Sequence, residues 1–260
     1  MMNNHKTVLF NGCSFTGNCG FLDGNLKHRW TELFSKKYNL SATNIAIGGS
    51  SNDEIFYRCL DSILTCKPDL AVIMWSCISR RWEYFSNNNI DDFTILNNLN
   101  TKGFCAGTAA AVEFAKLRLT YFNNMYVNFK KWLRYAIYLD AFLKINQIDY
   151  IFLKGFDNET SELSRMFRLI HQKDFDLMLF SDSIRTMLDY KNRNDEFIIQ
   201  KVNELKLLYS TAKNLNWANF EDKSFLELTE DTADDHMHPG ILTNQKLYII
   251  LSNYYEIIYS

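Results

Sequence analysis

The stretch Lys6-Thr-Val-Leu-Phe-Asn-Gly-Cys-Ser-Phe-Thr16 decides the fold that the sequence predicts. Its apolar run, Val8–Phe10, is typical of a buried β-strand and stops at Asn11-Gly12. The chain then enters a polar, glycine-bearing loop that contains Ser14. A buried strand that ends in Gly-x-Ser can present a serine hydroxyl at the rim of a sheet, although many serines after strands only cap a helix.

Strand and helix patterns alternate after this first strand, which covers about 6–11. Apolar residues at helical spacing predict helices, and short apolar runs between them predict strands. The expected helices are 29–38, 51–66 and one from Thr243 onward; the expected strands are 43–47, 69–75, 149–153 and a short fifth one at 217–220. This alternation indicates an α/β fold, a three-layer α/β/α sandwich with a central parallel sheet of about five strands.

The remaining segments predict insertions into one domain that covers 1–260. Residues 77–105 are polar, rich in asparagine and without a regular pattern, whereas 108–145 and most of 157–215 have helical patterns. No linker separates a second domain. We expect the insertions, about 77–130 and 155–215, to form a cap or substrate-side region over the sheet.

Three loops should converge at one edge of the sheet. Ser14, Gly48-Gly49 and Ser76 each follow a predicted strand. Because binding sites of parallel α/β sheets form at the carboxyl ends of the strands, we expect these residues to lie close together.

A second stretch, Asp235-His-Met-His238-Pro239, supplies the partners that a nucleophilic serine needs. A histidine titrates near neutral pH and can take the serine proton. A carboxylate three residues earlier can hold the ring and fix its tautomer. The cluster from Asp234 to His238 also has the composition of a zinc or manganese site, but the chain offers few other histidines to complete one.

These blocks resemble the SGNH or GDSL hydrolase superfamily. The first block reads Gly12-Cys-Ser-Phe-Thr16, with cysteine where the family has aspartate, and the second reads Asn44-Ile-Ala-Ile-Gly-Gly-Ser-Ser-Asn52. The family's last block, Asp-x-x-His-Pro, is matched by Asp235–Pro239. The resemblance implies a flavodoxin-like fold with Ser14 as nucleophile, His238 as general base and acid, and Asp235 as the orienting carboxylate. It also implies that the backbone N–H groups of Ser14 and Gly49 form an oxyanion hole.

The third block of the family departs from this pattern. Its asparagine after the third strand donates to the oxyanion, and here the chain reads Trp75-Ser-Cys-Ile-Ser-Arg-Arg81. Ser76 could donate instead, or Arg80 or Arg81 could reach the site. Phage and bacterial relatives with Trp-Ser or Trp-Thr followed by Arg look similar. Arg80 and Arg81 are candidates for holding an anionic or sugar substrate, although such arginines are more often solvated or ion-paired.

The resemblance implies a serine esterase that works through an acyl-serine intermediate without a cofactor or a metal. The expected substrate is a small-molecule or glycan ester, most simply an O-acetyl group on a carbohydrate. Two alternatives stay open: an inactive glycan-binding or virion-associated protein of the same fold, and an acyltransferase that uses the same residues.

Composition excludes several other classes of protein. Of 260 residues, 47% are hydrophobic, which is enough for a large core, and the net charge of −2 argues against a nucleic-acid partner. The six cysteines form no Cys-x-x-Cys pair, so we expect reduced thiols. No signal peptide or membrane-length apolar run is visible, which predicts a cytoplasmic protein without membrane contact, or a virion-associated one if a phage encodes it.

Overall fold

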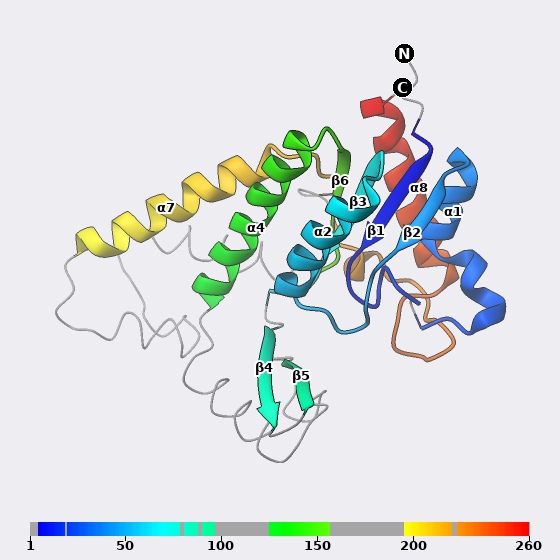
Figure 1. Ribbon diagram of the computed structural model, residues 1–260, viewed down its shortest axis with the longest axis horizontal. Coiled ribbons are helices and arrows are strands. Elements are labelled where there is room, and N and C mark those ends of the chain that lie inside the picture. Colours follow the sequence, from blue (N-terminus) through cyan, green and yellow to red (C-terminus); the bar gives the residue numbers. More distant parts are fainter. Residues whose placement is uncertain are drawn as a thin grey trace.

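A parallel four-stranded sheet is the centre of the fold (Figure 1). The computed structural model describes residues 5–18, 20–78, 81–87, 90–96, 125–156, 195–219 and 223–259. The strands are β1 (Thr7–Asn11), β2 (Ser41–Asn44), β3 (Leu70–Trp75) and β6 (Asp149–Lys154), in the order β2-β1-β3-β6. Beyond β6, Trp217 forms one parallel bridge with Phe152, where the sequence predicts a fifth strand. The predicted α/β class is confirmed.

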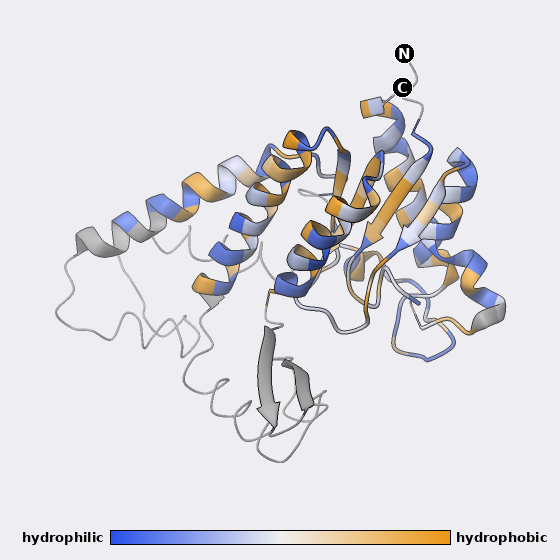
Figure 2. Cartoon of the chain, viewed as in Figure 1, coloured by the Kyte–Doolittle hydropathy of each residue, from blue (hydrophilic) through white to orange (hydrophobic). Residues whose placement is uncertain are grey.

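Helices cover both faces of the sheet because the strand residues alternate between them (Figure 1). Val8 and Phe10 of β1 pack toward α1 (Trp30–Tyr38) and α8 (Ile241–Tyr259). Leu9 packs on the other side, toward α2 (Asn52–Cys66), α4 (Met125–Ile145) and α7 (Asp195–Lys213). Figure 2 shows hydrophobic residues along the central strands, whereas the helices carry hydrophobic and hydrophilic residues. None of the helices in the described ranges is long and apolar enough to cross a membrane.

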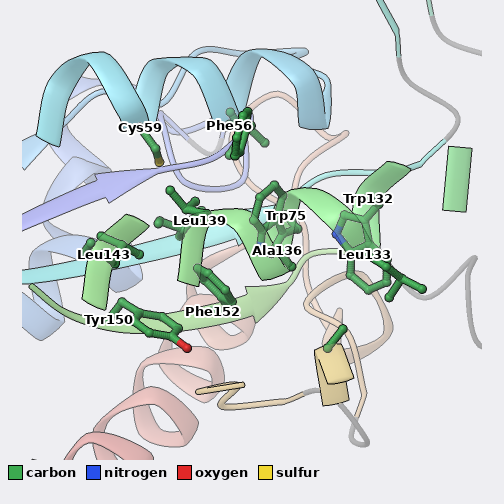
Figure 3. Close-up of a cluster of buried hydrophobic side chains, with 14 of the residues drawn as sticks. Phe56, Cys59, Trp75, Trp132, Leu133, Ala136, Leu139, Leu143, Tyr150 and Phe152 are labelled. Carbon is green, nitrogen blue, oxygen red and sulfur yellow. The ribbon is translucent and has the colours of Figure 1, made fainter. Parts of the chain in front are cut away.

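Large aromatic side chains fill the layer between the sheet and α4 (Figure 3). Trp75 and Phe152 come from neighbouring strands and meet at a ring-centroid distance of 5.6 Å. Trp132 from α4 packs on Trp217 at 5.7 Å. This apolar layer ends where Trp75, the last residue of β3, gives way to the loop that contains Ser76.

The start of α2 follows its sequence signal, whereas β2 lies earlier than predicted. Glu54 and Ser51 form the expected capping box, with 2.8 Å from Ser51 N to Glu54 Oε2. Strand β2 is an edge strand with exposed residues, so the apolar run that follows it does not mark its bounds. Instead, the Asn44 side chain turns the chain out of the sheet by accepting a hydrogen bond from Ala46 N at 3.1 Å.

An antiparallel hairpin replaces the irregular segment expected after β3. Strands β4 (Arg81–Asn87) and β5 (Ile90–Leu96) pair along their whole length, and β4 contacts α2. Figure 1 places the hairpin beyond the carboxyl ends of the central strands. Predicted helical segments at 108–124 and 157–194 lie outside the described residues.

Candidate active site

Ser14 lies at the carboxyl end of β1 in a tight turn. The backbone N–H groups of Thr16 and Gly17 both donate to the Cys13 carbonyl at 3.0 Å. A side chain at Gly12 would place Cβ 2.2 Å from Thr16 Oγ1, so the first glycine of the Gly-x-Ser motif is required sterically. Ser14 is partly exposed, whereas the residues on either side of it are buried.

The turn after β2 lies against this loop. Asn44 Nδ2 donates to the Thr16 carbonyl at 2.8 Å, and a Cβ added to Gly48 would lie 3.8 Å from Ser14 Cβ. Gly49 has φ +79°, a left-handed conformation that favours glycine. The structure therefore brings the Gly48-Gly49 turn next to Ser14.

Asp235 and His238 are hydrogen-bonded to each other. The distance from His238 Nδ1 to Asp235 Oδ2 is 2.5 Å, and Asp235 Oδ1 accepts the backbone N–H groups of Met237 and His238 at 3.0 Å each. His236, between them, has φ +56°, which closes the loop. Burial alone would raise the pKa of Asp235, but these hydrogen bonds and the nearby imidazole hold it below its ordinary value. The loop thus holds a carboxylate that is charged at neutral pH against one ring nitrogen.

Aromatic packing places His238 beside the Ser14 loop. The Phe15 ring meets the His238 ring edge-to-face at 5.8 Å, and Phe15 stacks on Phe156 at 4.8 Å. Because Phe15 directly follows Ser14, this contact joins the loop of Ser14 to the loop of His238. Among the hydrogen bonds of the described residues, none joins Ser14 Oγ to His238. Unbound active sites often lack this bond, which shortens when substrate is present.

The acidic residues before His238 anchor its loop. Asp231 accepts the N–H groups of Leu242 and Thr243 at 2.8 and 3.0 Å, which caps α8. Asp234 accepts Leu22 N at 2.9 Å. These carboxylates therefore have separate protein partners, and no group of three or more metal-ligating side chains occurs within the described ranges. The metal-site interpretation of this cluster gains no support from the geometry.

Ser76 is held by a residue that the motifs did not single out. Its backbone N–H donates to Asn52 Oδ1 at 2.7 Å, and its carbonyl accepts from Asn52 Nδ2 at 3.0 Å. Ser76 is 2% exposed. Its N–H therefore cannot serve an oxyanion without breaking the bond to Asn52. In the sequence, Asn52 ends the second block and belongs to the capping segment of α2, and neither pattern indicates a contact with Ser76.

The structure describes one of the two arginines that were predicted to bind substrate. Arg80 lies outside the described residues. Arg81 is the first residue of β4 and pairs with Leu96. Their substrate role stays a prediction.

Neither the comparison with models of known families nor that with curated proteins gives a match. Among solved structures, the chain is similar to the psychrotrophic esterase EstA from Pseudoalteromonas sp., with 12% identity over 97% of each chain and a TM-score of 0.49. It is also similar to an acetylxylan esterase from Geobacillus stearothermophilus, with 14% identity over 98% of this chain and 95% of that one, and a TM-score of 0.47. A GDSL-like lipase from Bacteroides thetaiotaomicron has 13% identity over 97% and 88%, and a TM-score of 0.46.

These likenesses lie below 15% identity and below a TM-score of 0.5, so they do not assign this chain to a family. A function for this chain has to be argued from its own residues.

Proposed function

We propose that this protein is a serine esterase of the SGNH type that hydrolyses a short-chain acyl ester. One observation carries the proposal: the Asp235–His238 pair, joined at 2.5 Å, lies on a loop that packs against the residue next to Ser14. A nucleophile, a base and a carboxylate that orients the base are the groups that acyl transfer requires.

In the first step, Ser14 Oγ attacks the ester carbonyl carbon while His238 Nε2 takes the hydroxyl proton. Asp235 accepts the hydrogen bond from Nδ1–H and stabilises the imidazolium that forms. When the tetrahedral intermediate collapses, the C–O bond to the alcohol breaks and His238 returns the proton to the leaving oxygen. Ser14 is then acylated.

In the second step, water attacks the acyl carbon and His238 takes one of its protons. The bond to Ser14 Oγ breaks, the proton goes to that oxygen, and the carboxylic acid leaves. The negative charge on the carbonyl oxygen in both steps needs N–H donors fixed in advance. The candidate donors are the backbone N–H groups of Ser14 and Gly49 and the side chain of Ser76, whose own backbone N–H is bonded to Asn52.

A small acyl group, such as acetyl on a carbohydrate hydroxyl, is the proposed substrate. The buried ring of Phe15 packs on those of Phe156 and Phe225 and on His238, and this aromatic packing favours a short acyl chain there. The hairpin of β4 and β5, which lies beyond the carboxyl ends of the strands, is proposed to contact the alcohol part.

A fluorophosphonate probe tests the nucleophile, because it labels a serine only where a base activates it. We expect the wild type to be labelled, and Ser14→Ala and His238→Ala to remain unlabelled. His236→Asn is the matched control: it removes a neighbouring imidazole, and asparagine tolerates the left-handed backbone there. Equal labelling of all four proteins, or of none, would refute the proposal. A screen of acetylated sugars and short-chain esters, with Ser14→Ala as the blank, then defines the substrate.

A glycan-binding protein of the same fold is the second candidate. It is favoured by the engaged N–H of Ser76 and by the missing hydrogen bond between Ser14 and His238 among the described residues. In that case calorimetry would detect glycan binding while the probe labels nothing. An acyltransferase would be labelled like the esterase, and would differ by passing the acyl group to an added sugar acceptor.

A further inference from the structure

Arg58 connects the two loops from which the proposed oxyanion donors come. It lies in the second turn of α2, outside the three sequence blocks. Its Nη2 donates to Ser50 Oγ at 2.8 Å and to the Gly12 carbonyl at 3.4 Å. Ser50 Oγ in turn donates to the Ile47 carbonyl at 2.8 Å. A single guanidinium therefore joins the end of β1, two residues before Ser14, to the turn that contains Gly49.

The surroundings of Arg58 are unusual for a residue that only stabilises the fold. It is half-buried, its Nε has no hydrogen-bond partner, and in the part of the chain that the structure describes it forms no ion pair. Burial lowers the pKa of the guanidinium, although Glu54 on the same helix face opposes this. Removing a charge from water without a direct ion pair costs stability. Because Arg58 lowers stability in this way, a role in joining the loops of Gly12 and Ser50 explains its place better than a role in packing.

We propose that Arg58 is a positioning residue, which holds the Gly49 turn against the Ser14 loop so that their N–H groups face the same carbonyl oxygen. This inference rests on the proposed esterase function. It follows from the hydrogen-bond pattern, because no other side chain among the described residues bonds both Gly12 and Ser50. The positive charge of Arg58 also lies beside the Gly49 turn, which would face the negatively charged carbonyl oxygen of the tetrahedral intermediate.

The test compares Arg58→Met and Arg58→Lys with the wild type, using p-nitrophenyl acetate and the labelling rate of the fluorophosphonate. We expect Arg58→Met to lower kcat about 100-fold with KM changed less than about 3-fold, because misplaced donors weaken the transition state and not substrate binding. Arg58→Lys, which keeps the charge and one donor, should lose about 10-fold. Arg134→Met is the matched control, since the partner of Arg134 among the described residues is Glu204, with which it forms an ion pair at 3.0 Å between α4 and α7.

A second variant covers the case in which Arg58→Met does not fold. Ser50→Ala removes the acceptor of the same link and should lower kcat about 10-fold. In the double variant with Arg58→Lys, the two losses should not multiply, because both act through one contact.

Several results would overturn the inference. Folded Arg58→Met with kcat within 2-fold of the wild type would do so, as would a rise in KM alone. Fully multiplicative losses in the double variant would also contradict it. If the wild type itself is neither labelled nor active, the proposed function fails and this inference falls with it.

Discussion

Replacing Gly20 by alanine should misplace the carboxylate that orients His238. A Cβ at this position would lie 2.4 Å from Cγ and from both oxygens of Asp235, whereas ordinary contact begins at 3.4 Å. The carboxylate must therefore move by about 1 Å or the loop must shift. Gly20 also has φ +69°, where a side chain costs about 1–2 kcal/mol.

The loss of activity follows from this displacement. A misplacement of about 1 Å in a catalytic arrangement costs about 100-fold in rate. The backbone penalty of about 2 kcal/mol should lower Tm by about 4–8 °C in a domain of this size. We therefore expect Gly20→Ala to stay folded at 25 °C, with kcat about 100-fold lower and a slower reaction with the fluorophosphonate.

Gly24→Ala is the control for this experiment. A Cβ at Gly24 meets no atom within 4 Å, and its backbone carries no strain of this kind. Activity and Tm should stay close to those of the wild type. The reasoning is refuted if Gly20→Ala and Gly24→Ala have the same kcat in folded protein, because then the contact with Asp235 does not fix the base.

Three further predictions test the polar contacts around this edge of the sheet. Asp235→Asn should lower kcat about 10⁴-fold at neutral pH, because an amide N–H facing Nδ1 of His238 selects the tautomer that cannot accept the serine proton; labelling kinetics measure this, and a loss below 10-fold would contradict it. Asn52→Leu should lower the free energy of unfolding by about 2–5 kcal/mol, since the N–H and carbonyl of Ser76 are left buried without this partner. Urea unfolding measures this change, and the control variant Asn52→Asp should lose less of the free energy of unfolding. Asp231 has a lowered pKa, because hydrogen bonds from Thr243 and the start of α8 outweigh burial, so its contribution to stability is present at neutral pH and lost as pH falls through the folded-state pKa. Asp231→Asn should therefore be less stable than wild type at pH 7, by about 1 kcal/mol for a lost helix cap, and the difference should shrink at about pH 3; a difference that grows on acidification would oppose this.

Much of the frame could be predicted because its signals are local. Strand β3 is buried on both faces, so its whole length is apolar and its bounds match the prediction within one residue. The capping box gave the start of α2 in the same way. Strand β2 was placed two residues late because it is an exposed edge strand whose register is set by pairing with β1. The hairpin of β4 and β5 was missed although Trp82, Tyr84, Ile90 and Phe93 favour strands, because the polar residues among and around them hide the alternation that marks a strand.

The candidate site was predictable where function needs a fixed residue type at a fixed spacing. Ser14, Asp235 and His238 could be named from such spacing, and they stay candidates until labelling is measured. Gly20, Asn52 and Arg58 could not be named, because each acts on a segment that is distant in the sequence. Asn52 contacts Ser76, and Gly20 contacts Asp235. Only the folded chain brings these pairs together.

The engaged N–H of Ser76 has a consequence for the proposed mechanism. The family pattern provides a side-chain donor after the third strand, and here the backbone N–H of Ser76, at that place, is bonded to Asn52. The backbone N–H groups that can face the oxyanion are then those of the Ser14 and Gly49 loops. Their relative position is set by contacts such as that of Asn44 with Thr16, at 2.8 Å. Substitutions that loosen these loops should therefore lower kcat more than the loss of a polar contact far from the site usually does. Asn44→Leu should lower kcat about 10-fold with little change in KM. An unchanged kcat in folded Asn44→Leu would mean that a side chain outside these two loops supplies the missing donor.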